Sequence, residues 1–576
     1  MFLALELCLT AIGAALAFIR PELGDAWFSR LETSLAAFAH KRALAVVSVG
    51  LLALGLRLAL LPILPVPQPE VHDEYSHLLL ADTLAHGRLA NPPHPMWVHF
   101  ETFHVNWRPT YASMYYPAHG LFLALGQVVL GHPFWGVWFS SGLMCAAICW
   151  ALQGWVPPQW ALLGGMLAVI RLGAFSYWTN SYWGGTVSAL GAALVLGAFP
   201  RIKRDQRARD AVLMAIGMAL LASTRPYEGL FFCIPFLIAL VWWMLGKDSP
   251  PLRRSVACVF APAAFVMACA FAGLGYYFYR VTGSPFTIPY QVNIHQYGLV
   301  YFPWDQIKPV QFHHPVMQMF YRGDPVIGVY NFARQHPFEL QFFKALVVWL
   351  FFFGPLLSMP ILVWLLTRRG NLWSSLNPDL RLVLVVCAVT YFSIMLTIYI
   401  GQPHYAAPLT PVFYLLILFA MHELWTWQWR GSPSGRFLVR AVPAICLILL
   451  IARAGASAIH VAPKPSWVRT WCSEDWQNLA RARVLKQLED TPGDHLVIVR
   501  YLPGHDFILD EWVFNNSDID GSKVVWARDM GPEKNAELLQ YFKNRRAWLV
   551  DPDVKPVQIL AYSAAQDQQP AAVATK

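Results

Sequence analysis

Residues 43–64 read ALAVVSVGLLALGLRLALLPIL, a run long and apolar enough to cross a lipid bilayer as one helix. Similar runs recur along the 576-residue chain, among them LALELCLTAIGAALAFI (3–19) and FFKALVVWLFFFGPLLSMPILVWLL (342–366). Hydrophobic residues make up 56% of the sequence and charged residues only 13%, whereas soluble domains carry about 25% charged residues. A soluble core cannot use so much continuous apolar surface, so the sequence predicts an α-helical polytopic membrane protein.

The apolar runs predict twelve membrane spans. They are expected near 3–19, 43–64, 134–153, 159–177, 183–199, 211–224, 228–246, 255–278, 342–366, 382–400, 405–423 and 437–456. Segment 118–131 is also apolar, but it is shorter than the roughly 20 residues that a span needs. We expect it to form a short helix or a re-entrant piece, and it is a thirteenth span only if it crosses fully.

The basic residues lie in short segments between the spans and thereby predict the orientation of the chain. The inner and outer segments alternate consistently when four basic segments are placed inside. These are 201–209, 247–254, Arg368 with Arg369, and Arg430 to Arg440. The large segments 65–117, 279–341 and 457–576 then lie outside. This pattern also accounts for the net charge of +9 without a nucleic-acid partner.

The predicted domains follow from these segments. Residues 1–42 are an extra helix with an inner loop, and 43–456 form the transmembrane domain. Residues 457–560 are expected to be a small extramembrane α/β domain, and 561–576 a disordered tail. The strand candidates of the α/β domain are HLVIVRY (495–501), KVVWARD (523–529) and AWLVDPD (547–553), and PEKNAELLQYFKNR (532–545) is expected to be a helix. The nine cysteines include no CxxC pair and are interpreted as buried thiols.

The first outer loop carries the strongest candidate for chemistry. Asp73 and Glu74 follow the 43–64 span closely, and LLLADTLAHGRL after them predicts an amphipathic helix in the membrane interface. A partly desolvated carboxylate there can act as a general base, because desolvation raises its pKa toward the working pH. Two alternatives remain: the acids cap the helix or face solvent, or HDEYSH binds a divalent cation. The same loop supplies His72, His77, His94, Glu101, His104 and Arg108.

A second signal is a set of ionisable residues in or beside the apolar spans, where charges are costly and usually line a cavity or pathway. They are Arg171, Arg225, Glu228, Arg280 and His404. In the predicted topology each lies toward the outer end of its helix, at the depth of Asp73. Arginine suits a phosphate group held at the interface, although Arg225 and Glu228 can also form a simple local ion pair.

The outer Asp-Glu pair after an early span, the helix LLLADTLAHGRL and the aromatic, Pro-rich stretch behind it resemble GT-C glycosyltransferases. The likeness is to the branch of protein O-mannosyltransferases and lipid A aminoarabinose transferases, and TGSPFTIPY and HYAAPLTPVFYLL resemble that branch too. The resemblance covers roughly residues 43–425. The resemblance implies that Asp73 is the base or orienting group, with Glu74 adjacent. Glu101 is the nearest match to a second loop acid. No WWDYG-type motif is present.

The expected activity is transfer of a sugar from a polyprenyl-phosphate carrier to an acceptor glycan, lipid or protein, most simply with inversion. Asp73 would deprotonate or orient the acceptor hydroxyl, one of the arginines Arg171, Arg225 and Arg280 would hold the departing phosphate, and His404 with Tyr405 would line the cavity. No cofactor is required, although a divalent cation is possible. The expected location is a bacterial inner membrane, with the C-terminal domain outside. Two alternatives remain: a transporter or flippase of a lipid-linked or anionic substrate, and a non-catalytic scaffold whose C-terminal domain binds a partner.

Overall fold

A computed structural model describes all residues except 247–249, 368–375, 400, 462 and 563–576. Within the described part, nine helices are long and apolar enough to cross a membrane. They are α1 (Phe2–Ile19), α3 (Arg42–Ala59), α7 (Phe134–Leu152), α9 (Thr186–Asp205), α11 (Pro226–Leu245), the continuous helix Leu252–Thr282 that contains α13, α20 (Pro378–Met395), Pro403–Leu424 with α21, and α22 (Ser434–Ala458). The chain is a multi-pass membrane protein, as predicted.

Each of the twelve predicted spans coincides with a helix, but three differ from expectation. Helices α8 (Pro158–Leu172) and α10 (Ala208–Ala222) have only 15 residues each. At 1.5 Å per residue, such a helix reaches about 22 Å, which is less than the roughly 30 Å apolar thickness of a bilayer. The third case is 342–366, which is not one straight helix.

The apolar run 342–366 is divided into α17 (Pro337–Phe352) and α18 (Gly354–Thr367), which meet at an angle of 98°. Gly354 has a φ of +58°, which glycine adopts without strain. Glu6 of α1 accepts a hydrogen bond from the Leu356 amide (3.3 Å), at the start of α18 where backbone N–H groups lack helical partners. Arg171 donates to the Phe353 carbonyl (3.3 Å). A side-chain pair from two distant helices therefore stabilises the break.

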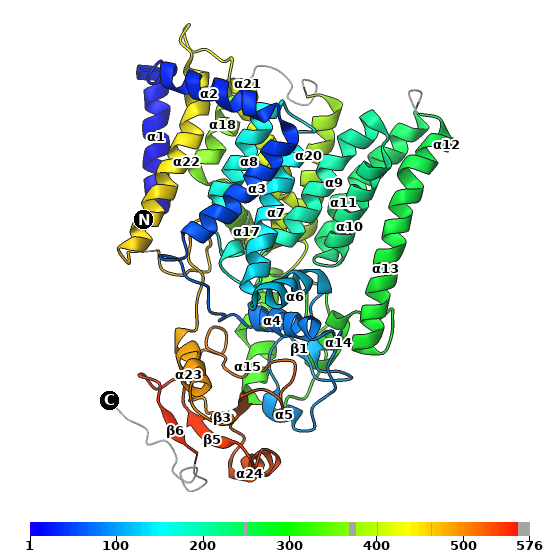
Figure 1. Cartoon of the computed structure of the whole chain (residues 1–576), viewed down its shortest axis with the longest axis vertical. Coiled ribbons are helices and arrows are strands. Elements are labelled where there is room, and N and C mark those ends of the chain that lie inside the picture. Colours follow the sequence, from blue (N-terminus) through cyan, green and yellow to red (C-terminus); the bar gives the residue numbers. More distant parts are fainter. Residues whose placement is uncertain (247–249, 368–375, 400, 462, 563–576) are drawn as a thin grey trace.

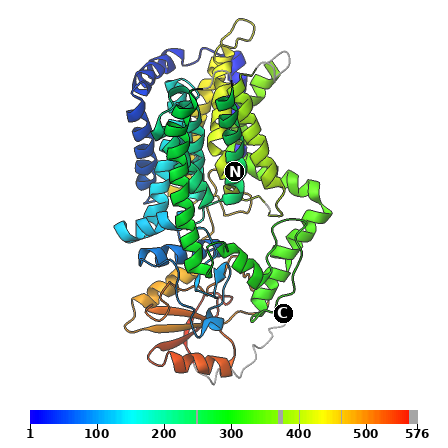
Figure 2. The same ribbon diagram turned by 90° about the vertical axis from the view of Figure 1, so that its right-hand side faces the viewer.

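Segment 118–131 forms the short helix α6 (Pro117–Leu130), which lies across the foot of the bundle rather than along it (Figures 1 and 2). It packs against α4 (His72–Ala85) and α7. One face is buried, while Leu121, Leu125 and Val128 are exposed. A helix with that pattern suits the membrane interface, so α6 adds no span to the expected alternation.

The segments predicted to lie outside gather at one end of the bundle (Figure 1). This end holds α4, α5 (Trp97–Phe100), the two-stranded pair β1 (Val105–Asn106) and β2 (Ala112–Ser113), and the second outer loop with α14 (Pro289–Tyr297), α15 (Pro315–Arg322) and α16 (Val329–Gln335). The opposite end carries α2 (Asp25–Ala39), a helix in the segment predicted to be an inner loop.

The C-terminal region contains a four-stranded sheet in the order β4 (Val524–Arg528), β3 (His495–Val499), β5 (Arg546–Val550), β6 (Ile559–Ala561). The first three strands are parallel and β6 is antiparallel to β5. The three predicted strands and the helix α24 (Pro532–Tyr541) are confirmed, whereas α23 (Leu479–Glu489) and β6 were not predicted. The predicted disorder of the tail lies, from residue 563 onward, outside the described residues.

The buried pair of Glu6 and Arg171 should contribute to stability rather than to substrate binding. Its atoms are 3.1 Å apart and its side chains only 3% and 1% exposed. We expect Arg171→Gln to lower the free energy of unfolding by about 3–5 kcal/mol, because it leaves a buried carboxylate unpaired. Thermal unfolding of the detergent-purified protein measures this. Lys203→Gln is the matched control, because its pair with Asp379 is partly exposed; equal unfolding temperatures for the two variants would contradict the expectation.

Candidate functional site

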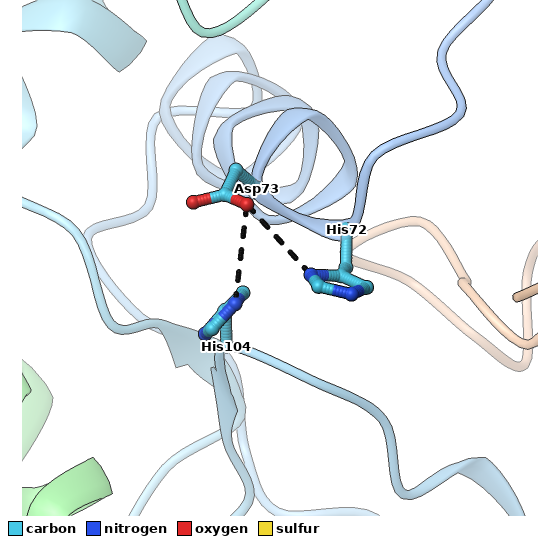
Figure 3. A group of neighbouring side chains, drawn as sticks. All are labelled: His72, Asp73 and His104. Carbon is cyan, nitrogen blue, oxygen red and sulfur yellow. Dashed lines mark ion pairs between the residues drawn. The ribbon is translucent and has the colours of Figure 1, made fainter. Parts of the chain in front are cut away.

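Helix α4 begins at His72, so Asp73 and Glu74 both lie in its first turn. Asp73 accepts a hydrogen bond from the Tyr115 hydroxyl. Its carboxylate lies 3.7 Å from His72 Nδ1 and 3.9 Å from His104 Nε2 (Figure 3). The Asp73 side chain keeps 26% of its surface exposed, although the neighbouring His72 and His104 are buried. Protein groups therefore surround the Asp73 carboxylate on several sides, and its remaining side is exposed.

The surroundings of Asp73 favour the ionised carboxylate, so the expectation that desolvation raises the pKa of this residue is wrong. Burial acts to raise the pKa of Asp73, but His104, His72 and the Tyr115 hydrogen bond together hold that pKa well below its usual range. Burial lowers the pKa of His104 to about 4, although Asp73 opposes this. Burial and Asp73 raise the pKa of Tyr115 well above its usual value. At neutral pH the site thus holds a carboxylate, a neutral imidazole and a phenol that donates.

Glu74 has a different role from Asp73. It is 1% exposed and accepts hydrogen bonds from the backbone amides of Glu70 (3.0 Å), Val71 (3.2 Å) and Tyr182 (3.0 Å). The first two bonds cap α4, and the third ties it to the segment before α9. Burial, reinforced by Asp475, raises the pKa of Glu74 to about 8. The capping alternative therefore describes Glu74, while Asp73 remains the candidate for chemistry.

The start of α11 and the segment before α21 bring in Arg225, Glu228, His404 and Tyr405. Arg225 lies 3.6 Å from Glu228, and its guanidinium is 4.6 Å from the centroid of the Tyr405 ring. The Arg225 side chain is 22% exposed. The ring of His404 lies beside that of Tyr405, with centroids 4.9 Å apart. These four predicted residues therefore lie together.

Tyrosines connect the two sides of this site, and the sequence analysis singled out only Tyr405 among them. The rings of Tyr115 and Tyr290 lie 5.6 Å apart, those of Tyr290 and Tyr301 6.0 Å, those of Tyr301 and Tyr399 5.4 Å, and those of Tyr399 and Tyr405 6.3 Å. We call these five residues the tyrosine wall. The aromatic clusters in SMYYPAHG and TIPYQVNIHQYG were a signal for it, but enrichment of tyrosine at membrane interfaces obscures that signal.

Four other predicted residues are engaged elsewhere. Arg171 is paired with Glu6. Arg280 is exposed and donates to the Tyr276 hydroxyl (3.1 Å). Arg108 is exposed and lies over the ring of Trp97 (5.4 Å). Glu101 is buried and accepts hydrogen bonds from Tyr297 and His313.

The residues around Asp73 also fit a divalent cation. Ligand atoms of His72, Asp73 and His104 all lie within 4.8 Å of one another (Figure 3). Among the described residues, neither ring nitrogen of His72 has a hydrogen-bond partner, and Nδ1 of His104 has none either, although all three are buried. Buried polar atoms are usually satisfied, and imidazole with carboxylate suits ions such as Zn²⁺ or Mn²⁺.

Comparison with models of protein families gives no match, and neither does comparison with curated proteins. Among solved structures, the oligosaccharyltransferase of Archaeoglobus fulgidus with Zn and sulfate has 13% identity and a TM-score of 0.48, covering 88% of this chain and 67% of its own. ArnT from Cupriavidus metallidurans in the apo state has 13% identity and a TM-score of 0.47, covering 92% and 100%. ArnT bound to undecaprenyl phosphate has 14% identity and a TM-score of 0.45, covering 88% and 92%. Both proteins belong to the GT-C superfamily that the sequence resembles, but scores this low assign neither an activity nor site residues to this chain.

The raised pKa of Glu74 makes the stability of the protein depend on pH. Because the folded state binds this proton more tightly than the unfolded chain does, stability should fall as the pH rises from the usual carboxyl range to about 8. We expect the unfolding temperature of Glu74→Gln to rise relative to that of the wild type between about pH 5 and pH 8, and the difference to level off above that range. Thermal unfolding at several pH values tests this. A constant difference between the two proteins would contradict it.

Proposed function

We propose that this protein is a membrane glycosyltransferase that moves a sugar from a polyprenyl-phosphate carrier to an acceptor hydroxyl at the outer face of a bacterial inner membrane. The observation that carries the proposal is that two partly exposed charges of opposite sign lie at the two ends of one chain of tyrosine rings. Asp73 and Arg225 are 26% and 22% exposed, and the tyrosine wall joins them. A carboxylate suits an acceptor hydroxyl, and a guanidinium suits a phosphate.

In the proposed reaction the acceptor oxygen attacks the anomeric carbon of the sugar from the face opposite the phosphate. The new carbon–oxygen bond forms as the bond between the anomeric carbon and the phosphate oxygen breaks, which inverts the anomeric centre. The hydroxyl proton passes to Asp73, and the carrier phosphate leaves with the electron pair of the broken bond. Arg225 stabilises the charge that develops on that phosphate.

The surroundings of Arg225 suit this role. Glu228 holds the guanidinium from one side at 3.6 Å, and the Tyr405 ring supports it from another. His404, fixed by a hydrogen bond between its Nδ1 and the Tyr177 hydroxyl (2.9 Å), lies beside Tyr405 with ring centroids 4.9 Å apart. The arginine is therefore oriented before substrate arrives, which makes electrostatic stabilisation of a departing phosphate effective.

The central test is release of polyprenyl phosphate from a panel of synthetic polyprenyl-phosphate hexoses by purified protein in detergent, with membrane lipids, glycans and proteins supplied as acceptors. Asp73→Asn should lower the rate by about 10²–10⁴-fold, the usual contribution of a general base, without lowering the unfolding temperature. Asp379→Asn, a partly exposed carboxylate far along the chain from this site, is the matched control and should release carrier at the wild-type rate. Full activity of Asp73→Asn would contradict the assignment.

A second question at the same residues is whether they hold a cation. Bound there by His72, Asp73 and His104, a divalent ion would act as a Lewis acid beside the acceptor. We expect metal-free protein to bind one Mn²⁺ or Zn²⁺ by isothermal titration, and His104→Ala to weaken binding at least about tenfold. His94→Ala is the control, because His94 of the same loop is bound to Asp520 (3.1 Å). If His104→Ala leaves the affinity unchanged, Asp73 acts as a free carboxylate.

A transporter or flippase is the alternative, and the same assay separates it from the transferase. A transporter needs a route to the other end of the bundle, and it moves its substrate without breaking a bond. Release of carrier phosphate in detergent, where no two compartments exist, is expected only of a transferase. Tight binding of undecaprenyl phosphate without any release from the hexose panel would favour the transporter.

A further inference from the structure

The C-terminal sheet lies next to the segment that carries α4 and α5 (Figure 1). A buried cluster of charges joins the two. We propose that Arg528, at the end of β4, is a positioning residue for the Asp73 site and acts through the turn Glu101–His104. This inference rests on the proposed function, because it assigns the C-terminal domain a part in the same reaction.

Arg528 joins the two segments through separate nitrogens of its guanidinium. Nε donates to the backbone carbonyl of Glu101 (2.6 Å), and Nη2 donates to the Glu511 carboxylate (2.9 Å). The side chains of Arg528 and Glu511 are only 3% and 0% exposed. Glu511 is itself held by the Tyr501 hydroxyl and by the amide of Val513. The guanidinium is therefore a fixed bridge rather than a mobile surface group.

Glu101 makes this bridge a junction of three extramembrane segments. Its carboxylate accepts hydrogen bonds from the Tyr297 hydroxyl (3.0 Å) and from His313 (3.2 Å), both in the second outer loop. Burial raises the pKa of Glu101, while His313, Tyr297 and Arg528 act to lower it. The carbonyl of Glu101 faces the C-terminal domain and its side chain faces the second outer loop, so the start of the turn is held from two sides.

The rest of the turn leads directly to Asp73. Phe103 is buried and packs on His72 (ring centroids 4.9 Å apart) and Phe320 (4.6 Å). His104 has a φ of +58°, a conformation that residues other than glycine adopt only under constraint. Its carbonyl accepts a hydrogen bond from Ser76 of α4 (2.7 Å), and its Nε2 lies 3.9 Å from Asp73. Displacement of the turn would move the His104 imidazole away from the carboxylate and would shift the Phe103 ring that packs on His72.

The C-terminal domain also reaches the turn at a second point. Phe507, in the segment after β3, lies against Phe103 and Phe320, with ring centroids 6.5 Å apart in both cases. The contact by Arg528 is thus part of a continuous interface, and the domain is attached to the side of the site occupied by His72 and His104. Tethering at both ends of a short strained turn limits the positions that its side chains can take.

The experiment compares Arg528→Gln and Arg528→Lys with Arg545→Gln in the full-length protein. Arg545 is the matched control, because it donates to the carbonyls of Ser522 and Asp520 within the C-terminal domain. We expect both Arg528 variants to lower kcat for carrier release by about 10–100-fold, the size of effect that a displacement of about 1 Å produces, with little change in KM. Lysine should not rescue, because one ammonium cannot reproduce the two directed bonds.

Coupling to His104 separates positioning from a general loss of stability. If Arg528 acts through His104, the double variant Arg528→Gln with His104→Asn should be no slower than His104→Asn alone. Independent, multiplicative losses would overturn the proposal. So would a kcat of Arg528→Lys equal to that of the wild type, or a loss in Arg528→Gln no greater than in Arg545→Gln.

Hydrogen exchange tests the link without any catalytic assay. The peptide covering 101–106 should exchange faster in Arg528→Gln than in the wild type and be unchanged in Arg545→Gln. Unchanged exchange in Arg528→Gln would overturn the proposal even if the protein is an active transferase. A different pair of results would separate the two proposals. Faster exchange in Arg528→Gln would support the link between Arg528 and the turn, and a wild type that releases no carrier from the hexose panel would contradict the proposed function.

Discussion

The structure depends on how charged side chains are accommodated in an apolar bundle. A buried charge is costly unless it is paired or hydrogen-bonded. Arg57 meets this constraint by donating to the carbonyls of Leu64 and Pro65 that follow α3. Lys344 of α17 does so by donating to the carbonyls of Ile394 and Thr397 at the end of α20. Neither side chain has measurable exposure. Such charges donate hydrogen bonds to carbonyls at the ends of helices, and their burial makes them inaccessible to a substrate.

The short segment after the last span provides partners for four more buried charges. Arg469 and Asp475 form a pair at 2.7 Å within it, Glu474 binds Arg453 of α22 at 3.0 Å, and Trp471 donates to Glu6 at 3.0 Å. The same segment therefore contacts the first span and the last span, and it reaches the break between α17 and α18 through Glu6. Arg469 also donates to Gln402 (3.1 Å), next to the segment that carries His404 and Tyr405. The ion pairs that stabilise the bundle thus also support one side of the candidate site.

Hydropathy predicted the membrane class and the helices well, because a bilayer demands long apolar runs whatever the tertiary contacts are. It could not predict the 98° break, which depends on Gly354 and on the hydrogen bond that the Leu356 amide donates to Glu6. It also treated Arg171 and Arg225 alike, since both are single arginines among apolar residues. Their difference lies in partners that are distant in the sequence, as with Glu6, 165 residues from Arg171. Asp73 and Glu74 are adjacent, and only the direction of each side chain in the first turn of α4 separates them.

Exposure is the property that divides the charges into two groups. The structural charges are closed, whereas Asp73 and Arg225 keep part of their surface open while surrounded by protein. Successive contacts between tyrosine rings connect these two open charges. Phenols can donate and accept hydrogen bonds and present a flat apolar face, and they do so without adding charge. Burial raises the pKa of Tyr290 and of Tyr301 well above the usual value, so these phenols stay neutral. A neutral wall with a carboxylate at one end and a guanidinium at the other suits a substrate that is polyhydroxylic in the middle and anionic at one end, as a sugar phosphate is.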